Sequence, residues 1–109
     1  MEILKGRRNI ITVIITENQA IFDLTGYTAN IVIAIAAGVT PELEKAGIIS
    51  NPENGEIVFT ILPVDLTTAR PGSFKYEVNI WKTADHTIVF TPITGNVEIK
   101  RALDDDPTD

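Results

Sequence analysis

The residues that could do chemistry are few. The only histidine, His86, follows Asp85, and Ser50 and Ser73 are the only serines. Serine, histidine and aspartate side chains form a catalytic relay when a fold brings them together. This chain, however, has no Gly-x-Ser-x-Gly segment of the kind that presents a nucleophilic serine on a sharp turn. Because Asp85 and His86 lie in a predicted hairpin turn, we expect a solvated histidine and no catalytic residue.

The acidic residues nearest to apolar segments are Asp23, Asp65 and Glu77. Glycoside hydrolysis would need two carboxylates that converge in a cleft. Asp23 and Asp65 each precede a leucine and lie close to a threonine, a setting that favours a carboxylate accepting backbone N–H bonds in a turn or cap. We therefore predict structural roles for both.

The composition argues against a metal or cofactor site. The 109 residues include no cysteine and one histidine, which excludes a disulfide scaffold, a thiolate zinc site and a cysteine nucleophile. The seven glycines are scattered and do not form a phosphate-binding loop. The aspartates near the C-terminus lack the glycine and glutamate spacing of an EF-hand. We expect no cofactor and no metal.

The net charge of −6 is concentrated at the C-terminus, because four of the fifteen acidic residues lie within residues 104–109. The rest of the chain is nearly neutral and lacks the basic stripe that duplex DNA binding needs. We interpret the small basic group of Lys5, Arg7 and Arg8 as a solvated strand edge. Neither a membrane-spanning run nor a signal peptide is evident, so we expect no nucleic-acid or membrane partner, and assembly in the bacterial cytoplasm.

Apolar and polar residues alternate over most of the chain, which is the pattern of half-buried strands. The alternation is unbroken over residues 74–80, and residues 86–91 offer Ile88 and Phe90 to a core. Residues 29–37 carry large β-branched side chains on one face, which favours a central strand over a buried helix. Further strands are predicted over residues 8–16, 56–62 and 96–101.

Turn signals separate these strands. Asn54-Gly55 predicts a hairpin because both residues tolerate positive φ, and Thr94-Gly95 marks a later turn. Two short segments are predicted as helical turns. Residues 40–45 begin with a capping threonine followed by proline, and residues 63–70 end before Pro71-Gly72.

Six or seven short strands without a long helix predict an all-β fold. We expect an antiparallel β-sandwich of about seven strands with one or two helical turns, and a small closed barrel is the alternative. We assign residues 1–103 to a single domain and residues 104–109 to a disordered acidic tail.

Trp81 and Tyr27 are candidate interface residues. Strict alternation along the strand places Trp81 on the polar face with Lys75 and Glu77, where an exposed aromatic ring is a candidate hot spot for binding. Two alternatives stay open: this face is covered within the domain, or a bulge near Lys82 turns the ring inward. Tyr27 raises the same question.

Four segments carry turn-and-strand signatures that occur together in one family. They are Phe-Asp-Leu-Thr-Gly-Tyr-Thr-Ala at 22–29, Asn-Gly-Glu-Ile-Val-Phe-Thr-Ile at 54–61, Arg-Pro-Gly-Ser-Phe-Lys-Tyr-Glu-Val at 70–78 and Thr-Pro-Ile-Thr-Gly-Asn-Val at 91–97. Over residues 8–103 the chain resembles the immunoglobulin-like domains of bacteriophage virion proteins. It is similar to the N-terminal domains of phage upper baseplate proteins, with related domains in tail and head fibre proteins.

The resemblance implies a non-enzymatic structural subunit of a phage or prophage particle that docks onto other virion proteins, with homo-oligomer formation left open. The candidate contacts are Trp81 and Tyr27, with Arg7 and Arg8 on the N-terminal edge. The alternative is a carbohydrate- or receptor-binding module on the same sandwich, with Trp81 beside Asn79. Baseplate members continue into a stalk and this chain ends at Asp109, so we expect a free-standing subunit or a truncated domain.

Overall fold

The computed structural model describes residues 1–36 and 38–101, without the side chains of residues 86–88. The side chain of His86, the domain boundary at residue 103 and the acidic tail over residues 104–109 lie outside the described residues. The strands form a five-stranded sheet, a three-stranded sheet and a small hairpin.

The larger sheet has the order β1-β10-β9-β5-β6 and the smaller one the order β2-β8-β7. The strands of the larger sheet are β1 (Glu2–Lys5), β10 (Asp85–Arg101), β9 (Gly72–Lys82), β5 (Tyr27–Ala34) and β6 (Leu43–Ala46). Those of the smaller sheet are β2 (Asn9–Ile14), β8 (Glu56–Ile61) and β7 (Ile48–Asn51). The hairpin pairs β3 (Thr16–Glu17) with β4 (Ala20–Ile21), and the 3-10 turns are η1 (Pro52–Asn54) and η2 (Pro63–Leu66).

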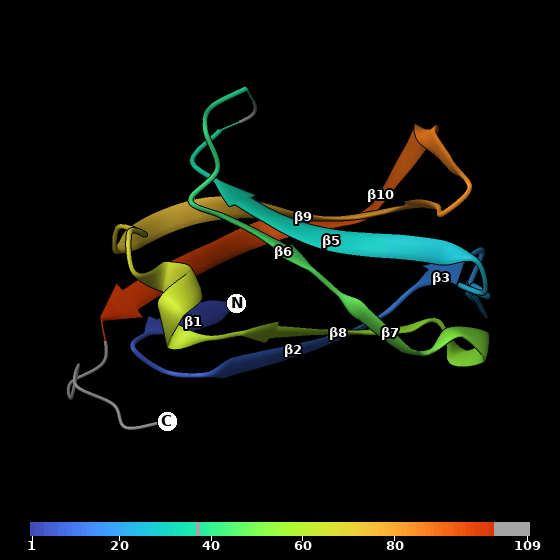
Figure 1. The fold of residues 1–109 in the computed structure, drawn as a ribbon, viewed down its shortest axis with the longest axis horizontal. Coiled ribbons are helices and arrows are strands. Elements are labelled where there is room, and N and C mark those ends of the chain that lie inside the picture. Colours follow the sequence, from blue (N-terminus) through green and yellow to red (C-terminus); the bar gives the residue numbers. More distant parts are fainter. Residues whose placement is uncertain (37, 102–109) are drawn as a thin grey trace.

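The two sheets pack face to face. Figure 1 shows β5, β9 and β10 above β2 and β8, with the chain crossing diagonally from β6 in one layer to β7 in the other. The predicted all-β sandwich is confirmed. The alternative of a closed barrel is wrong, because the two sheets share no paired strands over the part of the chain that the structure describes.

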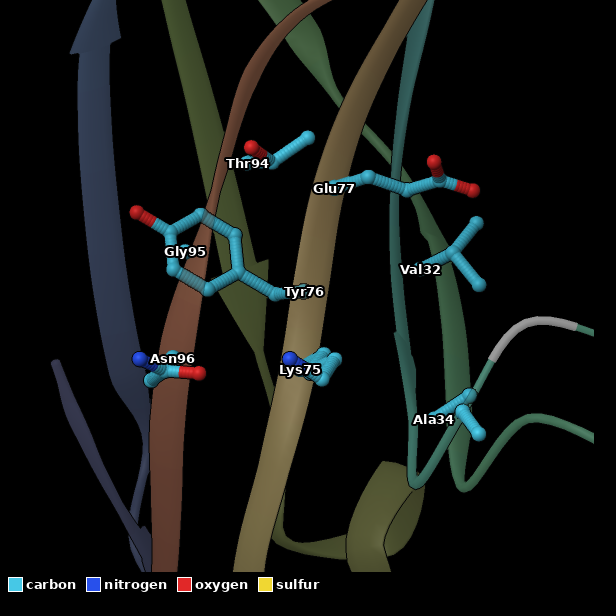
Figure 2. A pocket seen from close by; sticks show the side chains of 9 residues that line it. Val32, Ala34, Lys75, Tyr76, Glu77, Thr94, Gly95 and Asn96 are labelled. Atoms are coloured by element: carbon cyan, nitrogen blue, oxygen red, sulfur yellow. The ribbon is translucent and has the colours of Figure 1, made fainter.

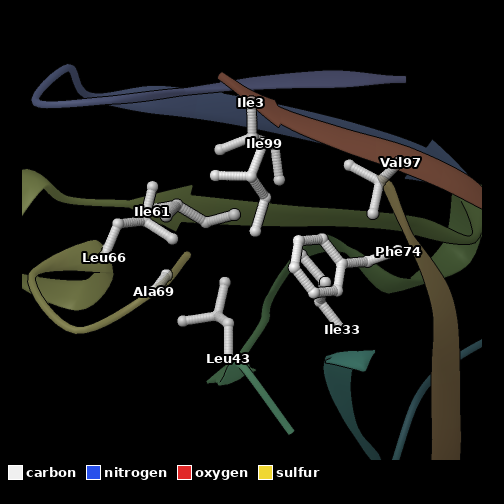
Figure 3. Close-up of a cluster of buried hydrophobic side chains, with 9 residues drawn as sticks. All are labelled: Ile3, Ile33, Leu43, Ile61, Leu66, Ala69, Phe74, Val97 and Ile99. Atoms are coloured by element: carbon white, nitrogen blue, oxygen red, sulfur yellow. The ribbon is translucent and has the colours of Figure 1, made fainter. Parts of the chain in front are cut away.

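The predicted alternation builds the core. In β8, Ile57, Phe59 and Ile61 are fully buried, while the residues between them are half-buried. In β5, the inward residues Ala29, Ile31 and Ile33 face them from the other sheet, and β5 is an internal strand as predicted. The core divides into two clusters along the sandwich, and Figure 3 shows the one that contains Ile3, Leu66 and Phe74.

At two places the chain passes from an edge strand of the larger sheet to an edge strand of the smaller one. The chain passes from β6 to β7 through Gly47 alone. A Cβ atom at Gly47 would lie 2.6 Å from Cε1 of Phe59 and 2.7 Å from Cγ2 of Ile57, so glycine lets the backbone cross directly over the core. On the opposite side the chain passes from β1 to β2 through a turn in which Gly6 has φ +80°.

Three local predictions were wrong. Residues 40–45 do not form a helix: Leu43 is buried and β6 pairs with β5, because burial and sheet pairing outweigh the local capping signals. Thr94-Gly95 is not a turn but lies inside the single long strand β10. Phe90 lies opposite the buried Ile80, yet its side chain is 49% exposed because the core ends there.

The other turns agree with the sequence. The turn η1 connects β7 to β8, and of Asn54 and Gly55 only Gly55 has a positive φ. The turn η2 lies within the predicted residues 63–70. Asp23 and Asp65 have the predicted structural roles. The Oδ1 atom of Asp23 accepts hydrogen bonds from the backbone N–H (2.9 Å) and hydroxyl (2.6 Å) of Thr25. The Oδ2 atom of Asp65 accepts one from the backbone N–H of Leu62 at 2.8 Å.

Candidate docking surface at one end of the sandwich

The aromatic residues are unevenly distributed, and four of them lie at one end of the sandwich. This aromatic end comprises Phe22, Tyr27, Trp81 and Phe90. Tyr27 begins β5 and lies opposite Lys82, while Trp81 lies opposite both Thr28 of β5 and Val89 of β10. Figure 1 shows the same end at the right, where β3, η1 and the β9–β10 hairpin meet.

Trp81 lies on the outer face of the larger sheet. The pairing of β9 with β5 is continuous from Lys75 to Lys82, so Trp81 keeps the same face as Lys75 and Glu77. The alternative in which a bulge in β9 turns the ring inward is therefore wrong. The register shifts are in β10 instead, one between Asp85 and Val89, opposite Lys82 and Trp81, and one between Phe90 and Ile93. The Trp81 side chain is half-buried.

Tyr27 lies on the opposite, core-facing side of the larger sheet. It is half-buried at the rim of the core and makes an edge-to-face contact with Phe22, with ring centroids 5.4 Å apart. Tyr27 and Trp81 thus lie at the same end but on the two sides of one sheet. A partner covering the end of the sandwich would reach both, whereas a partner lying flat on one face would not.

A groove of about 410 Å³ opens at this end, and we call it the end groove. Its apolar lining is Ile15, Phe22, Tyr27, Ile80, Phe90 and Pro92. The polar lining is Thr16, Glu17 and Thr91. Phe22 and Phe90 are the site residues that the sequence analysis missed. Phe90 carried a misleading signal, because its alternation indicates the core and only the tertiary structure shows that nothing covers it.

The other two sequence candidates lie far from these. Arg7 and Arg8 occupy the β1–β2 turn, at the end of the sandwich where β1 pairs with the last residues of β10. Arg8 is exposed, whereas Arg7 is half-buried and donates a hydrogen bond from Nη1 to the carbonyl of Gly6 at 3.2 Å. Nearby Lys5 is not a solvated edge residue, because its Nζ atom donates to the carbonyl oxygen of Ala69 at 2.7 Å.

The end that holds Arg7 and Arg8 is fastened by side chains, and we call it the closed end. Lys45 Nζ lies 2.8 Å from Asp65 Oδ2, and Arg70 contacts both carboxylate oxygens of Glu42. The hydrogen bond from Lys45 holds the pKa of Asp65 below its ordinary value, and that from Arg70 does the same for the pKa of Glu42. At the aromatic end the pKa of Asp23 is lowered by hydrogen bonds from the hydroxyl and the backbone N–H of Thr25 within its own turn.

A second hollow, of about 420 Å³, lies on the outer face of the larger sheet. Figure 2 shows it between β10, β9 and β5, with Thr94 and Asn96 on one side and Val32 and Ala34 on the other. The side chains on β5 and β10 are small and leave it shallow, while Lys75 and Glu77 project separately from β9. No set of polar groups converges there, so this hollow is a weaker candidate than the end groove.

A third surface is the outer face of the smaller sheet. Ile10 and Ile48 are 61% and 67% exposed there. Register places Thr60 opposite Ile10 and Glu56 opposite Ile14, so polar side chains separate the apolar ones. The described strands present no aromatic side chain on this face.

The polar groups beside Trp81 are already engaged. The side-chain nitrogen of Asn79 donates to Oδ1 of Asn30 at 3.2 Å, and its oxygen accepts from the hydroxyl of Thr91 at 2.6 Å. Asn79 is 8% exposed. A sugar-binding site needs free polar groups beside the aromatic ring, so this arrangement does not favour the carbohydrate-binding alternative.

Comparison with known proteins agrees with this architecture. Residues 7–108 match the BppU N-terminal domain. The chain belongs to this family. BppU N-terminal domains are phage baseplate domains, so the chain is a domain of a virion component that associates with other virion proteins.

A solved structure shares the fold. The N-terminal domain of ORF48 of phage TP901-1 superposes with a TM-score of 0.63 at 13% sequence identity, covering 91% of this chain and 82% of that one. A likeness at this identity concerns the fold alone. No curated protein matches the chain. The resemblance found in the sequence to baseplate-protein domains is thus confirmed.

Nothing in the described part of the molecule points to other chemistry. Among the described residues no group of three or more acidic or histidine side chains is close enough to hold a metal ion. No described helix is long and apolar enough to cross a membrane.

Proposed function

We propose that this domain is a non-enzymatic docking subunit of the baseplate and that its aromatic end is the surface that contacts another virion protein. The observation that carries the proposal is that Phe22, Tyr27 and Phe90 line the end groove while Trp81 lies at the same end, on the outer face of the larger sheet. Aromatic side chains on a part-exposed surface supply large contact areas with little loss of conformational entropy, and they dominate binding energies at protein interfaces.

The polar surroundings support docking over catalysis. Glu17 is the one charged residue among those that line the end groove, so no pair of carboxylates meets there to share acid and base roles. Arg7 and Arg8 are at the closed end and cannot belong to the same contact. They are kept as candidates for a separate contact with a further virion protein or a second copy of the chain.

The proposal is tested with Trp81→Ala. We expect incorporation into phage particles to fall by about tenfold or more, the loss typical of a binding hot spot, with an unchanged melting temperature. The readout is the copy number of the chain in purified particles by quantitative mass spectrometry. The matched control is Val64→Ala, an exposed residue of η2 at the closed end, which should be incorporated normally.

Two results would contradict the proposal. If Trp81→Ala lowers the melting temperature together with incorporation, Trp81 stabilises the fold and is not an interface residue. Absence of the wild-type chain from particles would remove the virion role for this chain altogether.

A further inference from the structure

The longest strand of the molecule has one incompletely covered edge. β10 spans Asp85–Arg101 and pairs with β9 along one side as far as Ile99. On its other side it pairs with β1, but only over Glu98–Arg101. Within the described residues, β10 before Glu98 therefore has no neighbouring strand on this side. This stretch, from Phe90 to Asn96, is called the open edge.

The backbone of the open edge points outward at defined positions. The N–H of Glu98 donates to the carbonyl of Met1 at 3.0 Å, so the backbone groups of Glu98 face away from β9. The register of β10 with β9 is continuous from Ile93 to Ile99. Because backbone groups alternate in direction along an antiparallel pair, the N–H and C=O of Asn96 and Thr94 face the same way as those of Glu98, beyond the reach of β1.

The end groove lies beside the open edge. Phe90, Thr91 and Pro92 of β10 form one wall of the groove, and Ile15, Thr16 and Glu17 form the facing wall. An extended segment of about six residues spans about 20 Å, enough to run along β10 from Phe90 to Asn96. Its backbone would pair with Thr94 and Asn96, and its apolar side chains would enter the groove.

We propose that an extended, apolar segment of another virion protein adds to the larger sheet as a strand along the open edge. This is the mode in which backbone hydrogen bonds give affinity and side-chain pockets give specificity. The added strand would continue the edge that β1 begins, while filling the end groove. The inference rests on the proposed docking function and names the kind of partner that the same site takes.

The charges of this end argue against the chain's own acidic segment as the occupant. Glu17 lines the groove, and Asp23 at the same end is held ionised by its turn. The segment at residues 104–109 carries four aspartates and no long apolar side chain, so it would be repelled and would leave the groove unfilled. A neutral or basic apolar segment fits instead.

The shape of the edge argues against a second copy of the chain. Pro92 has no N–H to donate, and the bulge at Thr91 and Pro92 breaks the register. Proline and bulges are the devices by which natural sheets prevent edge-to-edge pairing. Two open edges therefore cannot form a continuous ladder with each other, whereas a short segment that pairs beyond the bulge avoids it.

Amide hydrogen exchange tests this directly, with the free chain compared with the chain in purified particles. We expect the amides of Thr94 and Asn96 to exchange at least about tenfold more slowly in particles, as hydrogen-bonded amides do. The amide of Glu98 should be slow in both states, because β1 already covers it. Unchanged exchange at Thr94 and Asn96 in chains that are present in particles would overturn the strand addition and leave docking by the aromatic end intact.

A backbone variant provides the second test. Asn96→Pro removes an outward N–H without removing a bond to β9, and we expect at least about a tenfold loss of incorporation. Asn96→Ala keeps the N–H and should be incorporated normally. Normal incorporation of Asn96→Pro would overturn the proposal. So would protection of Thr94 and Asn96 in the concentrated free chain together with a doubled mass, because the occupant would then be a second copy.

Discussion

The two ends of this sandwich differ in how completely the core is covered. At the closed end, η2 and β1 cover the core through Leu66 and Ile3, whose side chains are fully buried. Side-chain bonds such as Lys45–Asp65 then fasten the covering segments. At the aromatic end the covering is less complete, and Tyr27 and Phe90 remain partly exposed around a groove. The difference leaves partly exposed aromatic surface available for binding at the second end.

The largest test of this comparison replaces one phenylalanine at a time. Phe59 is fully buried between the sheets and Phe90 is half-exposed at the groove. We expect Phe59→Ala to lower the free energy of unfolding by about 3–5 kcal/mol because it leaves a cavity. Phe90→Ala should cost about 1 kcal/mol or less, because its side chain is already half in water. Urea denaturation measures both, and similar losses would mean that the aromatic end is part of the core.

A smaller effect is expected where the chain crosses between sheets. Gly47→Ala would place a methyl group within 2.6 Å of the buried Phe59 ring, and overpacking of this kind costs about 1–3 kcal/mol. Ile48→Ala, one residue further on and 67% exposed, is the control and should be nearly neutral. Thermal unfolding distinguishes the two variants. An unchanged melting temperature for Gly47→Ala would show that the core next to Gly47 has room for a methyl group.

The smallest expected effect is the loss of thermal stability at acidic pH. The pKa of Asp65 is below 3.8 and that of Glu42 below 4.5 in the folded chain. Both carboxylates therefore stabilise the fold fully above those ordinary values, and the contribution is lost as the pH falls through the lowered pKa values. We expect the melting temperature to fall below about pH 4.5.

Asp65→Asn and Asp23→Asn separate the two ends in this respect. Asp65 joins β6 to η2 through Lys45, whereas the partner of Asp23 lies two residues away in the same turn. The acid-dependent loss of melting temperature should therefore shrink more in Asp65→Asn than in Asp23→Asn. The reverse order, measured by thermal unfolding between pH 3 and 7, would place the fastening interactions at the aromatic end.

Local patterns were reliable wherever one physical cause acted. Residues 56–62 alternate because one face of β8 is buried, and the glycine at residue 55 follows from a positive φ that other residues adopt at a cost. The pattern failed where two causes competed. Residues 40–45 carry helix-capping signals, but pairing with β5 and the burial of Leu43 decided in favour of a strand.

The candidate site was predicted only in part for the same reason. Trp81 and Tyr27 stand out in the sequence as aromatic residues near a strand end, and the structure places them at one end of the sandwich. Phe22 and Phe90 join Tyr27 in lining the end groove, a tertiary arrangement that no local pattern records. Arg7 and Arg8 are candidate contacts in the sequence together with Trp81 and Tyr27, but they lie at the opposite end of the molecule.

By itself the sequence determined β2, β5, β8 and β9 with their buried faces, the turn at Gly55 and the resemblance to phage virion domains. These follow from side-chain alternation and backbone sterics, which act over a few residues. The tertiary structure alone decided that β1 covers only the last residues of β10 and that Phe90 meets a groove. Such outcomes depend on segments that are distant in the sequence, because a strand edge is covered only where another segment packs beside it.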